Sequence, residues 1–375
     1  CSSDLGGISC FAALRSDLVD NQQFSGYMTF SSRTLNPKSA DMLKLVAETS
    51  RSARFDEPER MRELIQRLAL SRTSNIASNG HQFAMLAASR RFRAVTVLSD
   101  HLSGIPGIIR LQRLADALDD SEACGHLADR FRALHLLLSH PAPNILLISD
   151  DEHLPVLEQE IMSLWEPGPA TEIDPPAVPD AGVKDPAYVV TTQVNYCAAA
   201  FATVAESHPD AAVFPILAGV LRNNFLHPMI REKGGAYGGG ASHDSGNGVF
   251  KLYSYRDPRL VDTFDDFSRA IEGLLNTDIT DNMLEEAMLG VVSGVDSPGS
   301  PSGEIRAAFH HHLHGRSAAH RKAVRSRYLE VRQADLKRVV KDYLYGEPSV
   351  AVVTSEQRLA ELPERFTIIR VNESA

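Results

Sequence analysis

Two stretches of this 375-residue chain resemble each other, so we expect the fold to contain an internal duplication rather than a chance similarity. Residues 26–33 read Gly-Tyr-Met-Thr-Phe-Ser-Ser-Arg, and residues 248–256 read Gly-Val-Phe-Lys-Leu-Tyr-Ser-Tyr-Arg. Both stretches are typical of a β-strand, and each is followed by Asn-Pro or Asp-Pro, which favours a turn. Amphipathic runs follow over residues 39–51 and 260–275, so we predict a strand, a turn and a helix in each copy.

A second pair of similar stretches closes the two copies. Residues 143–150 and 348–355 both begin with proline and continue through an apolar run. Each leads into a predicted helix, which ends at residue 164 in the first copy and spans residues 356–362 in the second. The segments between the two pairs have mostly helical patterns. Those predicted helices span residues 59–70, 82–93, 280–292, 305–314 and 318–345, the last with a break near 332–335.

The two copies differ in how they begin. The second copy has a predicted strand over 188–196 and a predicted helix over 211–226 before it reaches its Gly-Gly pair at 234–235. The first copy has its Gly-Gly pair at residues 6–7, so it lacks both elements, and we expect the chain to be a fragment of a longer polypeptide.

A proline-rich segment separates the copies and cannot be helical. We therefore predict an α+β fold of two homologous domains, each an antiparallel-rich sheet with helices packed on it. The first domain, truncated at its N-terminus, spans residues 1–165, a linker spans 166–185, and the second domain spans 186–375.

Composition excludes several classes of protein. The formal net charge is −10, which argues against a general binder of nucleic acid or of anionic membranes. The four cysteines lie far apart, which excludes a disulfide scaffold and suits a reducing compartment.

Targeting segments are not expected either. Residues 1–10 are neither basic nor followed by a long apolar core, so we expect no signal peptide. The longest uncharged stretch, residues 187–205, contains several polar residues and is interpreted as a buried strand running into a helix of small residues. We predict no membrane partner, and a location in the cytoplasm or, in a eukaryote, in an organelle matrix.

The strongest candidate for a functional site is the segment of residues 224–240, Asn-Phe-Leu-His-Pro-Met-Ile-Arg-Glu-Lys-Gly-Gly-Ala-Tyr-Gly-Gly-Gly. One interpretation is structural: a helix end, a glycine-rich turn and the start of a strand. The other is functional, because glycine lets a second backbone approach, Arg231 offers a fork of donors and Tyr237 offers a phenolic donor. That pair could bind a carbonyl oxygen that gains negative charge during hydrolysis. A phosphate site is not indicated, because the glycines lead into a strand rather than a helix.

Residues 226–238 and 254–258 closely resemble the C-terminal half of presequence proteases, which belong to the pitrilysin and insulysin superfamily of zinc metallopeptidases. Residues 6–9, 79–84 and 297–301 add to the resemblance. It implies four homologous α+β domains in two halves that close around a peptide. It also implies a zinc site in the first half, held by the histidines of His-x-x-Glu-His and a distal glutamate, with the motif glutamate as general base.

The resemblance also gives roles to residues of this chain. Arg231 and Tyr237 match the arginine and tyrosine that hold the substrate backbone and stabilise the oxyanion. Aligning the two Gly-Gly pairs puts Ser3 and Ser9 opposite them, so only the second copy carries the pair. For Tyr255 and Arg256, a role beside the substrate and a structural role in a strand end are both open. The predicted substrate-binding set is Gly234, Gly235, Ala236, Gly238, Tyr255 and Arg256.

His-x-x-Glu-His does not occur in this chain. We therefore expect no metal site here, no peptidase activity from this chain alone, and zinc bound by an N-terminal half that is not part of it. The cluster from His310 to His314 would place histidines on one helix face, and adventitious metal binding is favoured over a functional site. His81 is interpreted as a packed or helix-capping residue.

The predicted function is the C-terminal half of a zinc metalloendopeptidase that degrades short unfolded peptides. Its predicted partners are the N-terminal catalytic half and extended peptide substrates. The alternative is a non-catalytic peptide-binding or assembly subunit of the same superfamily. Retention of both Arg231 and Tyr237 favours the enzyme, because a purely structural subunit has no need of that pair.

Overall fold

The structure is a computed structural model, which describes residues 5–139, 143–165 and 176–371. The first part of the chain, up to residue 165, begins with a long antiparallel hairpin of strands β1 (Leu5–Ser16) and β2 (Phe24–Thr34), which form a separate two-stranded sheet. The second part starts at residue 176. The hairpin is followed by a short 3-10 turn (Asn36–Lys38). The helices of the first part are α1 (Ser39–Arg51), α2 (Pro58–Ser89), α3 (Ala94–Ser103), α4 (Ile105–Ala117), α5 (Ser121–Ser139) and α6 (Leu154–Leu164).

The second part contains a six-stranded sheet with the order β5-β6-β4-β7-β3-β8. Strand β3 is parallel to β7 and to β8, and the other neighbouring pairs are antiparallel. The predicted α+β class with antiparallel-rich sheets is confirmed. The strands are β3 (Pro186–Val189), β4 (Tyr196–Ala202), β5 (Gly238–Asp244), β6 (Val249–Tyr255), β7 (Ser349–Thr354) and β8 (Thr367–Arg370).

Helices of three kinds accompany this sheet. The α-helices are α7 (Val213–Leu221), α8 (Val261–Asn276), α9 (Asp281–Asp296), α10 (Pro301–Leu313), α11 (Ala318–Glu330) and α12 (Gln333–Val339). Two π-helical segments, η3 (Arg222–Lys233) and η4 (Val340–Leu344), extend α7 and α12. Two 3-10 segments are η2 (Pro209–Ala212) and η5 (Glu356–Glu361).

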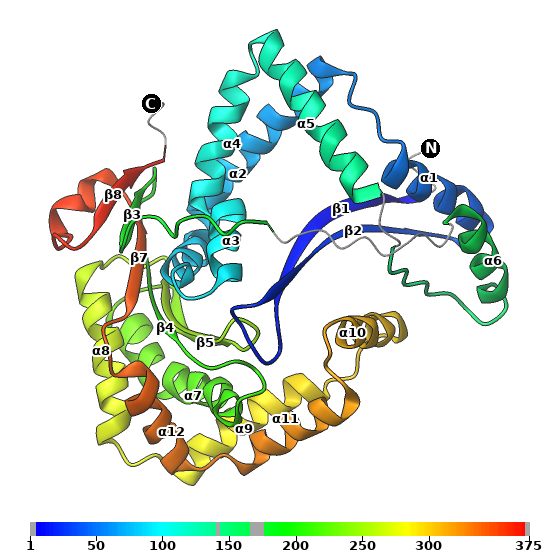
Figure 1. Cartoon of the computed structure of the whole chain (residues 1–375). Helices are drawn as coiled ribbons and strands as arrows, with labels where there is room; N and C mark the ends of the chain where they lie inside the picture. Colours follow the sequence, from blue (N-terminus) through cyan, green and yellow to red (C-terminus); the bar gives the residue numbers. More distant parts are fainter. Residues whose placement is uncertain (1–4, 140–142, 166–175, 372–375) are drawn as a thin grey trace.

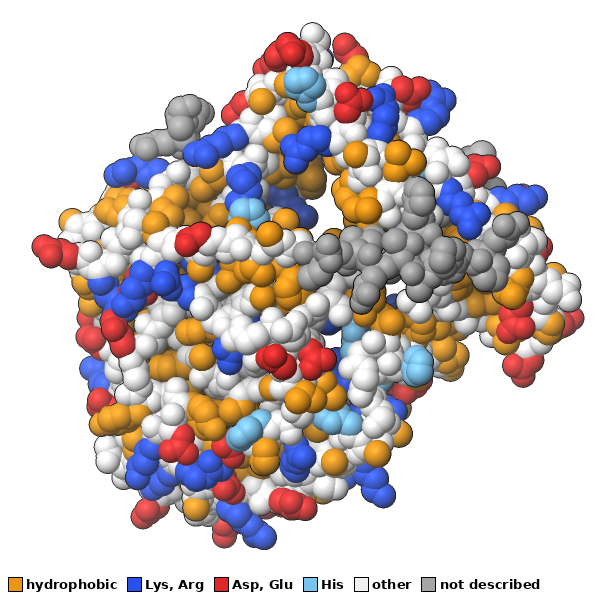
Figure 2. Space-filling view, in the orientation of Figure 1, with side chains coloured by type: hydrophobic (Ala, Val, Ile, Leu, Met, Phe, Trp, Pro, Cys, Tyr) orange, Lys and Arg blue, Asp and Glu red, His pale blue; other side chains and the backbone are white. Residues whose placement is uncertain are grey.

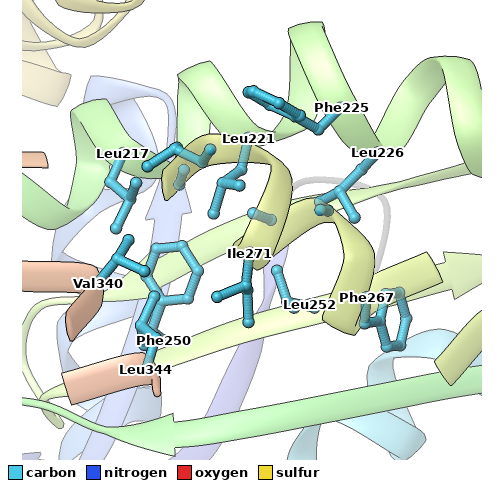
Figure 3. Close-up of a cluster of buried hydrophobic side chains, with 14 of the residues drawn as sticks. Leu217, Leu221, Phe225, Leu226, Phe250, Leu252, Phe267, Ile271, Val340 and Leu344 are labelled. Carbon is cyan, nitrogen blue, oxygen red and sulfur yellow. The ribbon is translucent and has the colours of Figure 1, made fainter. Parts of the chain in front are cut away.

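Both faces of the six-stranded sheet are covered. On one face α7, η3, α8, α9 and α12 enclose the larger core, in which Leu217, Phe250 and Ile271 meet (Figure 3). On the other face lie helices α2 and α4, which come from the first part of the chain. Ile76 of α2 and Ile105 of α4 are buried there against the sheet. The two parts of the chain therefore share one core.

The contact between α2 and β4 is unusually close. A Cβ on Gly80 would overlap the ring of the fully buried Tyr196, so only glycine fits at this crossing. The hydroxyl of Tyr196 donates to the C=O of Ala77 on the same helix. The two helices predicted over 59–70 and 82–93 meet in α2 at a kink at Asn79, where φ is −120°, and the second of them ends at Ser89 rather than at residue 93.

Two predictions for residues 187–205 are wrong. The single strand predicted over 188–196 is two strands, β3 and β4, and the backbone between them turns so that Asn195 pairs with Asp257. The helix of small residues is strand β4, whose side chains point alternately into the two cores. Side chains on both faces of β4 are buried against helices, and this tertiary packing outweighs the helical propensity of alanine.

Other boundaries differ less. The helix predicted over 211–226 is the continuous run of η2, α7 and η3, which ends at Lys233. Residues 143–150 resemble residues 348–355 in sequence, but only the second segment forms a strand, β7. The predicted linker lies partly outside the described residues, and residues 176–185 contain neither helix nor strand.

The hairpin of β1 and β2 extends away from the six-stranded sheet, and α1 and α6 pack near its far end (Figure 1). Its near end contacts the second part of the chain. The hydroxyl of Ser16 donates to the Oδ1 of Asn247 at 2.8 Å, and the N–H of Ser207 donates to the C=O of Leu18 at 3.2 Å. Among the helices of the described residues, none is long and apolar enough to cross a membrane.

Candidate functional site

The junction between η3 and β5 carries the arginine and tyrosine of the predicted site. Helix η3 ends in an αL-type cap, in which the N–H of Gly235 donates to the C=O of Arg231 at 3.1 Å. The N–H of Ala236 donates to the C=O of Ile230, also at 3.1 Å. Such a cap needs a residue in the left-handed region, and Gly235 provides it with a φ of +80°. Gly7, its counterpart in the first copy, has the same φ.

The neighbouring glycines let the helix and the strand approach each other. A Cβ on Gly234 would overlap the guanidinium of Arg259. A Cβ on Gly239 would lie 2.9 Å from the Cγ2 of Ile230, which is closer than side chains pack. Gly238 differs, because the nearest atom to its Cβ position is 3.9 Å away. Junction packing therefore explains Gly234 and Gly239, and substrate binding by the glycines stays a prediction.

Strand β5 is an edge strand of the six-stranded sheet. It pairs with β6 on one side, and within the described residues no strand pairs with it on the other. An unpaired edge presents a row of N–H and C=O groups that an extended peptide can join. The strand begins at Gly238, directly after Tyr237.

Tyr237, Tyr255 and Arg256 lie together at the start of this edge. The side chain of Tyr237 is 72% exposed, and its ring meets that of Tyr255 edge to face with 5.8 Å between centroids. The N–H of Tyr237 donates to the C=O of Arg256 at 3.3 Å. The guanidinium of Arg256 lies over the ring of Tyr255, 5.5 Å from its centroid. The backbone and the ring of Tyr237 are therefore held, while its hydroxyl faces solvent.

A buried pair that sequence reasoning missed, Asn195 and Asp257, fixes the turn that contains Arg256. Their backbones exchange hydrogen bonds of 2.7 and 2.9 Å, and the Nδ2 of Asn195 also donates to the C=O of Arg259 at 3.0 Å. The carboxylate of Asp257 accepts from the hydroxyl of Thr263 at 2.7 Å. Burial raises the pKa of Asp257 above its ordinary value. Arg256 has a φ of +49°, so this turn is held in a conformation that such a residue rarely adopts.

Arg231 is exposed on the same junction. Its Nη1 lies 3.2 Å from the Nε2 of His227, whose other ring nitrogen lies 3.4 Å from the carboxylate of Glu232. The guanidinium of Arg231 is thus directed toward His227 rather than toward Tyr237. Ala236, between them in sequence, is buried and its N–H is bonded to Ile230, so it offers little surface to a substrate. In the first copy, Ser9 lies in β1, and Ser3 lies outside the described residues.

His81 brings the first part of the chain to this site. Its ring packs edge to face on Tyr255 with 4.8 Å between centroids and also contacts Tyr196 and Tyr253. Burial lowers the pKa of His81, which favours the neutral ring. The interpretation as a packed histidine is confirmed.

Within the described residues, no group of three or more His, Cys, Asp or Glu side chains is placed to hold a metal ion. The rings of His310 and His314 stack with 6.1 Å between centroids, and His314 also packs against Tyr27. The donor set for the zinc that the resemblance implies is therefore not found in this part of the molecule.

Family models and curated relatives match this chain. Residues 1–114 match the family described as associated with subfamily C of the M16 peptidases, and residues 185–356 match the family described as PreP C-terminal domain. The mitochondrial presequence protease of Xenopus laevis is 30% identical over 369 residues, a match that covers 90% of this chain and 35% of that protein. That of Saccharomyces cerevisiae is 29% identical, covering 93% of this chain and 36% of that protein. The chain thus spans about a third of the length of these relatives.

Solved structures show the same fold at low sequence identity. A protease from Helicobacter pylori has a TM-score of 0.60 at 16% identity and covers 92% of this chain and 82% of its own. The inactive domain of an M16 peptidase from Pseudomonas fluorescens has a TM-score of 0.60 at 14% identity and covers 93% and 81%. From these two family matches and the curated relatives, we conclude that the chain belongs to the presequence protease family of M16 peptidases and corresponds to the C-terminal region of its members.

Proposed function

We propose that this chain is the substrate-holding part of a zinc metalloendopeptidase that degrades short unfolded peptides. The observation that carries the proposal is the unpaired edge of β5 with the exposed Tyr237 at its start. An extended peptide can add to this edge by backbone hydrogen bonds, which requires an unfolded substrate but little sequence specificity.

The side chains at the start of the edge are suited to a carbonyl group. A phenolic O–H from Tyr237 donates a hydrogen bond that becomes stronger as a carbonyl oxygen gains charge, and the guanidinium of Arg231 would join it by turning away from His227. The aromatic contact with Tyr255 and the bond to Arg256 hold Tyr237 before substrate arrives, so little has to be reorganised during the reaction. We propose no step on a metal by this chain's own residues, and any zinc would be held by a segment outside it.

The partner we propose is an N-terminal catalytic half of the same polypeptide. The first part of the chain supports this, because hydrophobic side chains are exposed on β1, β2, α2 and α5, and those around α5 are visible in Figure 2. In the second part, β6 pairs with β4 and β4 pairs with β7. In the first part, β2 and residues 143–150 occupy the corresponding positions in sequence, with no strand between them in the described residues. The exposed side chains include Phe11, Met28, Leu64, Leu68, Leu134 and Leu137.

One additional strand, placed like β4, would therefore pair with both of these segments. The compartment we propose is the cytoplasm or an organelle matrix, in line with the word mitochondrial in the names of the relatives.

The test is Tyr237→Phe in the longer protein that contains this chain, assayed on a short unfolded peptide. Loss of one oxyanion donor costs roughly 3 kcal/mol, so we expect about a hundredfold lower kcat. Stability should not change, because the hydroxyl faces solvent. Tyr345→Phe is the matched control, since Tyr345 is 71% exposed and lies away from the junction. Unchanged kcat in Tyr237→Phe would rule out the proposed role and favour the non-catalytic peptide-binding subunit.

The second test uses this chain alone. We expect no hydrolysis of the same peptide with added zinc, because the described residues offer no set of metal donors. Zinc-dependent turnover that follows the chain through purification, and that a chelator abolishes, would contradict the proposal that the zinc site lies outside this chain.

A further inference from the structure

One end of the six-stranded sheet carries more than the Tyr237 junction. Strands β6, β7, β3 and β8 all run in the same direction, so their carboxyl ends lie at one end of the sheet. Strand β5 runs the other way and begins at that end. Ligands of open sheets commonly bind in a crevice beyond the carboxyl ends of parallel strands.

A pocket of about 690 Å³ opens there, beyond the parallel strands β7, β3 and β8. It is lined by residues 189–193 after β3, by residues 355–358 after β7, and by Arg370 at the end of β8. This volume is in the range that holds a small ligand or a few residues of a peptide.

The residues that line the pocket include hydrogen-bond donors suited to a carboxylate, beside the carboxylate of Glu356. Hydroxyls of Thr191 and Ser355 and two guanidinium groups surround it, and Arg370 is already neutralised by Glu356 at 2.7 Å. Arg358 is 36% exposed, and its Nη2 donates to the C=O of Pro258 at 3.0 Å and contacts the carboxylate of Glu361 at 2.9 Å.

The Nε of Arg358 is buried and has no hydrogen-bond partner. An unpaired buried donor is costly, so a small shift of the guanidinium toward an anionic ligand would be favourable. Pro258 follows Asp257, so Arg358 is attached to the same turn that holds Tyr237.

We infer that this pocket binds a carboxylate of the peptide whose backbone is held at β5, either its C-terminal carboxylate or the side chain of an Asp or Glu. The inference rests on the proposed function, because it takes the ligand to be that substrate. From β5 to β3 there are four strand spacings. At about 4.8 Å each they amount to about 19 Å, which about six extended residues span. The pocket would thus favour peptides that continue at least that far beyond the residue at Tyr237.

The test measures binding of fluorescein-labelled, unfolded 12-residue peptides to this chain by anisotropy. One peptide ends in Gln with a free carboxylate, one ends in Glu amide, and one ends in Gln amide. We expect the Gln amide to bind about tenfold more weakly than at least one of the others. Tighter binding of the free acid identifies the C-terminal carboxylate, and tighter binding of the Glu amide identifies the side chain. Equal binding of all three overturns the inference.

The variant Arg358→Gln should abolish the difference among the peptides. Arg325→Gln is the matched control, because Arg325 is 42% exposed, also pairs with one carboxylate, and lies on α11 away from the sheet. Retention of the difference in Arg358→Gln also overturns the inference. Tyr237→Phe should instead weaken all three peptides alike, which separates failure of the pocket from failure of the proposed function.

If no 12-residue peptide binds, the proposed function fails and a second measurement tests the pocket. Acetyl-Ala-Gln with a free carboxylate, titrated to millimolar concentration, should shift the amide NMR signals of residues 190–193 and 355–358. Its amide analogue should not shift them. Absence of shifts with the acid overturns the inference by itself.

Discussion

At the scale of single residues, the imidazole of His243 makes the second part of the chain sensitive to pH. Its ring stacks on Phe214 with 4.8 Å between centroids, and its nitrogens lie 3.0 Å from the hydroxyl of Thr203 and 3.2 Å from that of Ser245. Burial lowers the pKa of His243 to about 4. Because the unfolded chain, with a histidine pKa near 6.5, binds more protons between these values, stability is full above pH 6.5 and declines as the pH falls toward 4.

Urea unfolding between pH 4 and pH 7 checks this expectation. The contribution of His243 to the free energy of unfolding should fall by up to about 3 kcal/mol over that range. His243→Gln should flatten this part of the profile, whereas His126→Gln, at an exposed position on α5, should leave it unchanged. A variant that keeps the full pH dependence would show that other groups cause it.

The residues of the candidate site were predictable where they are close in sequence. Arg231, Gly235 and Tyr237 fall within seven positions, so their arrangement follows from one helix cap and one strand start. Asn195 and Asp257 were not, because they are 62 positions apart and nothing local indicates that they pair. For Arg231 and Tyr237 the sequence predicted a shared junction, and their joint action on a carbonyl stays a prediction.

At the scale of elements, the close crossing of α2 over β4 depends on Gly80, which has no side chain. Gly80→Ala would drive a methyl group into the ring of Tyr196, so we expect a loss of about 2 kcal/mol in the free energy of unfolding. Gly125→Ala on α5, where a Cβ meets nothing within 4 Å, should instead stabilise by up to about 1 kcal/mol. Chemical denaturation of the two variants compares them directly, and equal effects would mean that helix α2 can move away from β4 at little cost.

Helices and strands were predicted well where a local hydrophobic pattern defines them. They were predicted poorly where contacts with elements distant in sequence decide the backbone conformation. Helix α1 begins and ends at the predicted residues, 39 and 51, because an amphipathic run and a turn define it. The alanine run of β4 reads as helix in isolation, and its packing between two helical layers makes it a strand. Residues 143–150 have a strand-like pattern that the structure does not realise, since a strand needs a partner to accept its hydrogen bonds.

At the scale of the whole molecule, the first part of the chain should respond to the additional strand proposed above. In this chain alone we expect fast amide exchange over residues 143–150 and slow exchange over Ser349–Thr354 of β7. In the longer protein, both segments should be protected. Hydrogen exchange followed by mass spectrometry distinguishes the two, and equal protection of both segments in this chain alone would argue against an incomplete sheet.

The position of α2 and α4 on the six-stranded sheet has a consequence for how this chain can be divided. Cutting it between its first and second parts would expose one face of the sheet and leave Tyr188, Tyr196 and the alanines of β4 facing water. The two parts should therefore unfold cooperatively, and neither is expected to be stable when expressed alone. A destabilising substitution in the first part of the chain should then also destabilise the second part. Selection on the helices of the first part is therefore linked to selection on the edge strand β5.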